Sequence, residues 1–183
     1  MGEPLLVRFD EGNWLLKEWS YSKSPEELLY QARNDDVIGR EWAVRELGRF
    51  PGVPEVEGVL TALAKDDPFW AVRVAAIEML AIDGGPQTLE TITAAARDEN
   101  SRVRRTAIRL LGERSDPALS AFFRDRFAED DSYQVQAEAL RAIGRIGDRS
   151  QLLFLEEALE MPSPRDVIRE AAEWAIETIS KDK

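Results

Sequence analysis

Apolar and small residues recur along most of the chain with the spacing of an α-helical face. Five segments share a polar position that is followed by an alanine three residues later and by a leucine or isoleucine seven residues later. These positions lie on one side of an α-helix, and the repeated alanine indicates that helices approach closely there. The polar positions recur about every 32 residues, at Arg40, Arg73, Arg104, Gln136 and Arg169, and the alanines are Ala43, Ala76, Ala107, Ala139 and Ala172.

A second helical pattern precedes each of the five segments. The first of them begins with Ser24, Pro25 and Glu27, which form the pattern of a capping box with proline at the first helical position. A capping residue before proline recurs at 116–117 and 163–164. One helix pair alone cannot bury its apolar face, so we predict an all-α fold, a right-handed α-solenoid of about five helix pairs. Glycines that can end a helix follow three of the segments: Gly48, Gly112 and Gly144.

The repeated pattern is similar to a known repeat family. The segment DENSRVRRTAIRLLG, residues 98–112, resembles the HEAT repeat, and related segments cover roughly residues 24–180. We therefore interpret residues 23–183 as a HEAT-like α-solenoid domain. The resemblance implies that the five polar positions are structural anchors of the repeats and not catalytic groups. They would tie loops and helices together with recurring aspartates: Asp35, Asp67, Asp98 and Asp131.

The beginning of the chain has a different pattern. Residues 4–21 contain two apolar runs around a turn at 10–13, so we predict a short β-ribbon in residues 1–22. A ribbon that is apolar on both faces needs other parts of a protein to bury both faces. An isolated two-stranded ribbon is only marginally stable in water. We interpret it as the remnant of a preceding β domain, which implies interdomain contacts by Trp14, Leu16 and Trp19.

A second resemblance joins the ribbon to the first helix. VRFDEGNWLLKE, residues 7–18, followed by EELLYQ, residues 26–31, resembles the junction between the β-sandwich and the C-terminal helical domain of aminopeptidase N-type zinc metallopeptidases. The D-x-x-x-R-x-x-A pattern of residues 36–43 is similar to the start of the bacterial members' helices. The resemblance implies a non-catalytic domain, cut from a larger enzyme, that closes the substrate chamber.

The same resemblance determines what we expect of cofactors and partners. The family's H-E-x-x-H zinc site and its G-x-M-E-N substrate loop have no match in the chain. We therefore expect no catalytic residue, no metal ligand and no cofactor here, with zinc and the peptide substrate belonging to the parent enzyme. The partners would be the parent's missing N-terminal and catalytic domains.

Composition narrows the chemistry further. The 183 residues include no Cys and no His, which excludes a thiolate zinc site, a cysteine nucleophile and a Ser-His-Asp triad. The formal charge of −11 disfavours nucleic acid and anionic membranes as partners. No export signal and no apolar stretch of membrane-spanning length is present, so we expect a cytoplasmic protein.

One row of positions carries candidate binding residues. In a solenoid of this kind, the residues one and five positions after each anchor would line the concave side. Guanidinium groups at these positions could bind a peptide carboxylate or acidic residues of a partner domain, or could be paired with neighbouring glutamates. The candidates for this anion or peptide contact are Arg45, Arg105, Arg109 and Arg141.

Other function classes stay open at this point. The alternative to an aminopeptidase domain is a stand-alone HEAT scaffold that binds a protein partner on its concave face. Among enzymes built on HEAT repeats, the metal-dependent hydroxylases need His-Glu ligand pairs, which this chain lacks, and the DNA glycosylases need a basic groove. Bilin-lyase-like proteins share the repeat, but nothing in the residues supports that function.

Overall fold

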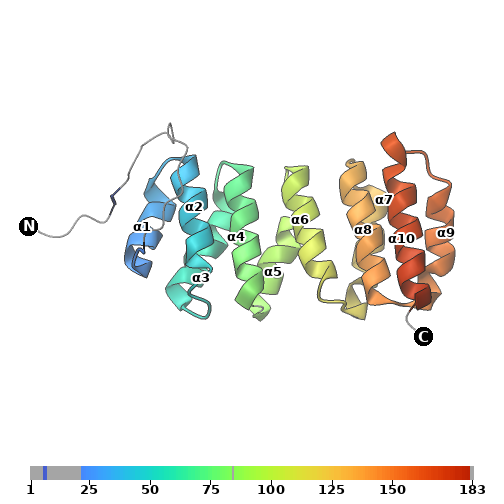
Figure 1. Ribbon diagram of the computed structural model, residues 1–183, viewed down its shortest axis with the longest axis horizontal. Coiled ribbons are helices and arrows are strands. Elements are labelled where there is room, and N and C mark those ends of the chain that lie inside the picture. The colour runs from blue at the N-terminus through green and yellow to red at the C-terminus, as the bar shows by residue number, and fades with distance from the viewer. Residues whose placement is uncertain (1–5, 8–21, 84, 182–183) are drawn as a thin grey trace, which may run out of the picture. The chain divides into compact units, whose positions relative to one another are not determined.

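All regular structure in the described part of the chain is helical. The computed structural model describes residues 6–7, 22–83 and 85–181, and within them the chain forms ten α-helices and three short 3-10 helices. Figure 1 shows the order of these helices along the chain. The predicted β-ribbon, with Trp14, Leu16 and Trp19, lies outside the described residues, except for Leu6 and Val7, which belong to no strand.

The chain folds into two compact units, and the first of them ends at Asp83. Helix α1 packs against α2 and α3 packs against α4, while α2 and α4 also contact each other. The second helices of the two pairs are therefore neighbours in one layer, and the first helices lie in the other. The four helices are α1 (Pro25–Asn34), α2 (Val37–Leu47), α3 (Pro54–Asp66) and α4 (Trp70–Asp83).

The second unit repeats the same arrangement over three pairs. Helix α8 contacts both α6 and α10, so these three second helices form a continuous layer, and α5, α7 and α9 each pack on the second helix of their own pair. The predicted all-α solenoid of five helix pairs is confirmed. The helices are α5 (Pro86–Ala95), α6 (Ser101–Gly112), α7 (Ser120–Glu129), α8 (Tyr133–Ile146), α9 (Leu152–Leu159) and α10 (Val167–Lys181), with η1 (Pro117–Leu119), η2 (Arg149–Gln151) and η3 (Pro164–Asp166).

Local sequence signals explain where helices begin. The Ser24 hydroxyl accepts a hydrogen bond from the Glu27 backbone N–H at 3.3 Å, and the Glu27 carboxylate accepts one from the Ser24 N–H at 2.8 Å. The predicted capping box is therefore confirmed. The two other pairs of capping residue and proline start the 3-10 turns η1 and η3, which lead directly into α7 and α10.

Small residues bring the second helices close together. The five repeated alanines are fully buried, and a Cβ atom added to Gly112 or Gly144 would lie 2.7 Å from an atom of the next second helix. Gly144 lies inside α8, and it is Gly147, with φ 77°, that ends this helix. The prediction that Gly144 ends a helix is wrong, because at this position the glycine makes room for Ala175 of α10.

Candidate functional site

The five anchor residues share one contact with the backbone. Each side chain donates a hydrogen bond to a backbone carbonyl oxygen that precedes its own helix. The acceptor lies in the connecting turn for four anchors and at the last residue of α9 for Arg169, so these bonds stabilise the connection where a helix pair changes direction. The bonds run from Arg40 to Asp35, from Arg73 to Asp67, from Arg104 to Asp98, from Gln136 to Asp130 and from Arg169 to Leu159.

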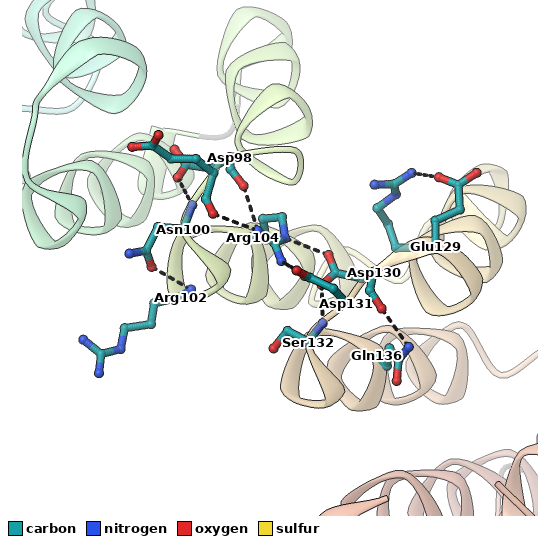
Figure 2. A network of polar contacts seen from close by, with 11 residues as sticks. Asp98, Asn100, Arg102, Arg104, Glu129, Asp130, Asp131, Ser132 and Gln136 are labelled. Carbon is teal, nitrogen blue, oxygen red and sulfur yellow. Dashed lines mark hydrogen bonds and ion pairs between the residues drawn. The ribbon is translucent and has the colours of Figure 1, made fainter. Parts of the chain in front are cut away.

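Arg40 and Arg104 also bind an aspartate of the following repeat. Arg40 forms a bidentate pair with Asp67, at 2.9 Å from Nε to Oδ2 and 3.1 Å from Nη2 to Oδ1. Arg104 binds Asp130 in the same way at 2.7 and 2.9 Å, and it reaches Asp131 at 2.6 Å (Figure 2). The bidentate partner in the fourth repeat is thus Asp130, one residue before the aspartate that the sequence pattern indicates.

Asp130 is an almost completely buried carboxylate of this network. Its side chain is only 3% exposed, and its Oδ1 also accepts a hydrogen bond from the Ser132 backbone N–H at 2.9 Å. Burial by itself would raise the pKa of Asp130, but the hydrogen bonds from Arg104 and Ser132 outweigh it and hold the pKa below its ordinary value. These residues stabilise the fold and have the geometry of a structural network, since the hydrogen bonds of Arg104 and Asp130 join separate turns of the chain.

Two of the four candidate arginines are paired with carboxylates. Arg45 forms ion pairs with Glu41, four residues earlier in α2, and with Glu78 of α4 at 3.2 Å. Arg109 donates to Glu113 at 2.8 Å. These pairs neutralise the positive charges locally, so neither arginine contributes a net positive charge to its surroundings.

The other two candidates converge on a buried carboxylate. The Glu138 side chain in α8 is 5% exposed, and its Oε2 lies 3.8 Å from Arg105 Nε of α6 and 3.7 Å from Arg141 Nη1 of α8. Its Oε1 accepts a hydrogen bond of 3.1 Å from Arg145 Nη1. The guanidinium of Arg145 also stacks over the Trp174 ring of α10, 5.6 Å from its centroid.

We call these five residues the Glu138 cluster: Arg105, Glu138, Arg141, Arg145 and Trp174. Three cations surround a single carboxylate, which leaves a local surplus of two positive charges in a chain whose formal charge is −11. The cluster includes an exposed guanidinium, Arg105, and an exposed indole, Trp174. It can therefore bind an anionic group that lies beside an apolar one.

Sequence reasoning missed two members of this cluster. Glu138 and Arg145 lie outside the row of positions one and five residues after the anchor. The signal that could have found them is their spacing along α8, because positions 138, 141 and 145 follow one another at intervals of three and four residues and so share one side of the helix.

No metal site competes with this interpretation in the part of the chain that the structure describes. Among those residues, no three His, Cys, Asp or Glu side chains lie together as metal ligands would. The helices described there also include none with the length and apolar character needed to cross a membrane.

Comparison with known proteins identifies the repeats. A family model described as HEAT repeats matches residues 25–102 and 89–177. No curated protein matches the chain. Solved structures that share its fold include the following two. One is the complex of CpcE and CpcF of phycocyanin lyase from Nostoc sp. PCC7120, with a TM-score of 0.66 and 19% identity over 92% of this chain and 70% of that chain. The other is human deoxyhypusine hydroxylase in complex with glycerol, with a TM-score of 0.59 and 17% identity over 86% of this chain and 62% of that chain.

These findings correct the resemblance to zinc aminopeptidases. The match is to HEAT repeats, and the similar structures are a lyase complex and a hydroxylase, so the expectations of an aminopeptidase, a metallopeptidase, a zinc enzyme and a hydrolase are wrong. The physical reason lies in the motif itself. Asp36 caps α2, Arg40 binds Asp67 and Ala43 is buried. A helix of any HEAT repeat requires a capping residue, an anchor for the turn and a small buried residue. The pattern therefore does not distinguish one family from another.

Proposed function

Because the chain belongs to the HEAT-repeat family, we propose that it is a scaffold that binds a protein partner on the surface of α6, α8 and α10. The observation that carries this proposal is the Glu138 cluster. It gathers surplus positive charge and an exposed indole on neighbouring second helices, and arginine and tryptophan are the residues that most often dominate the energy of protein interfaces.

The comparison with the CpcE and CpcF structure supports the proposal at the level of the fold. That structure is a complex of two proteins, so a chain of this architecture can assemble with a partner. HEAT repeats stack into extended surfaces that suit such binding. The comparison supports no more than this, since 17 to 19% identity establishes a common fold alone.

Site-specific photo-crosslinking tests the proposal. The photoreactive residue p-benzoylphenylalanine would replace Arg109 of α6 or Trp174 of α10 in the full chain, expressed in its source cells. The matched control carries it in place of Leu153 of α9, which is highly exposed but belongs to a first helix. We expect the same protein to be crosslinked from positions 109 and 174 and not from 153. The absence of any crosslinked protein from 109 and 174, or a partner captured only from 153, would overturn the proposal.

A further inference from the structure

We infer that the Glu138 cluster is a receptor for a carboxylate side chain, Asp or Glu, in an acidic segment of the partner protein. This inference rests on the proposed function and specifies what the partner presents. It starts from an imbalance in the cluster. Arg145 alone is within hydrogen-bond distance of Glu138, whereas Arg105 and Arg141 lie 3.8 and 3.7 Å from it.

The guanidinium groups of Arg105 and Arg141 therefore have N–H donors that can bind a ligand. Arginine carries five N–H donors, and within the described residues the guanidiniums of Arg105 and Arg141 make ion-pair contacts with Glu138 but no hydrogen bond of standard length. A carboxylate placed between them would accept charge-assisted hydrogen bonds from both, and guanidinium groups match the planar geometry of a carboxylate.

Glu138 prepares this arrangement before any partner arrives. Its carboxylate is almost completely buried and is held by the 3.1 Å bond from Arg145. It draws the side chains of Arg105 and Arg141 toward one point, which lowers the conformational entropy that would be lost on binding. Glu138 is thus a positioning residue, and the two arginines are the groups that would touch the ligand.

The surroundings of the cluster favour a short acidic segment over a polyanion. Glu170 of α10 is exposed one helical turn before Trp174 and shares its side of the helix, so it limits the positive region of α6 and α8 on that side. A nucleic acid would extend beyond it and be repelled by the remaining acidic surface. Trp174 offers an apolar contact beside the arginines, so a partner segment that alternates acidic and apolar residues complements the site.

A model peptide provides the direct test. The probe is a fluorescein-labelled dodecapeptide of alternating Leu-Glu-Glu units, and its control is the same peptide with every Glu replaced by Gln. Fluorescence anisotropy would be measured with the full chain at about 50 mM salt, where surface charges are only partly screened. We expect the Glu peptide to bind at least about tenfold more tightly than the Gln peptide.

Matched variants assign the binding to the cluster. Arg105→Ala with Arg141→Ala should weaken Glu-peptide binding by about tenfold or more. Arg114→Ala with Arg149→Ala removes the same charge from two exposed positions outside the cluster and should change the affinity less than about twofold. If the first pair of substitutions lowers the melting temperature, the variant Arg105→Lys with Arg141→Lys keeps the charge, and we expect weaker binding because lysine lacks the bidentate fork.

The outcomes separate this inference from the proposed function. Equal binding of the Glu and Gln peptides, equal losses in both double variants, or tighter binding of single-stranded DNA than of the Glu peptide would overturn the carboxylate receptor. A partner crosslinked from positions 109 and 174 would then still support the scaffold. Conversely, specific peptide binding without any crosslinked partner would support the receptor and contradict the scaffold.

Discussion

At the scale of single residues, the anchor arginines show why a guanidinium recurs in this sequence. Arg104 binds both oxygens of Asp130 and, with a separate nitrogen, the carbonyl oxygens of Asp98 and Glu99. One planar group thus joins two turns, and a single ammonium group could not span the same distances. Gln136 donates to the backbone carbonyl oxygen of Asp130, so an amide side chain is sufficient for the contact with the backbone, whereas the bidentate pair with an aspartate uses the guanidinium group.

The first prediction concerns this bridge. Arg104→Lys should lower the free energy of unfolding by about 2 to 4 kcal/mol, because Asp130 would be left buried with an incomplete partner. Urea denaturation followed by circular dichroism measures the change. Arg114→Lys, at an exposed position after α6, is the control and should stay within about 0.5 kcal/mol of the parent protein. A loss at position 104 no larger than that of the control would contradict the bridging role.

The second prediction follows from the lowered pKa of Asp130. Because the folded pKa lies below that of the unfolded chain, the unfolded chain binds this proton first as the pH falls. The stabilisation by ionised Asp130 is therefore complete above the unfolded pKa, near 4, and is lost as the pH falls through the folded value. Asp130→Asn should be less stable than the parent protein at pH 7, and the difference should shrink in acid. Unfolding experiments from pH 7 to pH 3 would contradict this if the difference were constant.

At the scale of helices, close crossings of the second helices depend on residues without side-chain bulk. Gly112 faces Ala142, and Gly144 faces Ala175, at distances that a Cβ atom would make too short. The helix period predicted the ten helices because it depends on local spacing. The spacing alone did not distinguish a glycine that ends a helix from one that packs against a neighbour, since both follow the last apolar position of the pattern.

The third prediction tests the packing role of glycine. Gly144→Ala should lower the free energy of unfolding by about 1 to 3 kcal/mol, because the added methyl group would force α8 and α10 apart. Gly58→Ala is the matched control: Gly58 lies in the middle of α3 with no atom within 4 Å of an added Cβ. It should stabilise the protein by about 0.5 to 1 kcal/mol through higher helix propensity. Thermal denaturation measures both, and a stabilised Gly144→Ala protein would refute the packing role.

At the scale of the whole molecule, the candidate site differs from the chain as a whole in the sign of its charge. The chain carries 35 acidic and 24 basic residues, and most of the ion pairs described above cancel charge locally. The Glu138 cluster departs from this balance, since three arginines share one carboxylate. At physiological salt, the electrostatic attraction of the cluster is screened beyond about 8 to 10 Å. This range suits recognition of a single anionic group.

The fourth prediction follows from that contrast. The full chain should not bind a 20-base-pair DNA duplex at about 150 mM salt, because an extended polyanion meets the acidic surface on either side of the cluster. Anisotropy of a fluorescent duplex titrated with the protein measures this. Binding in the micromolar range that weakens steeply with salt would show that the basic surface is larger than the cluster, and the expectation of no nucleic-acid partner would then fail.

The sequence by itself determined the architecture, because every signal for it is local. The helix period, the capping residues and the repeated alanines each act within a few residues, and together they predicted the ten helices and their pairing. The same locality explains the mistaken family at the start of the chain, where Asp36, Arg40 and Ala43 meet requirements common to all HEAT repeats. The resemblance there could identify a kind of helix but not a particular protein.

Only the tertiary structure decided which arginines form a site. Arg45, Arg105, Arg109 and Arg141 all belong to the row of positions one and five residues after an anchor, yet two are paired with nearby glutamates and two converge on Glu138. The difference arises from which side chains the neighbouring helices bring within a few ångströms. Coulomb energy depends on these distances in space, and the packing of α6, α8 and α10 determines them.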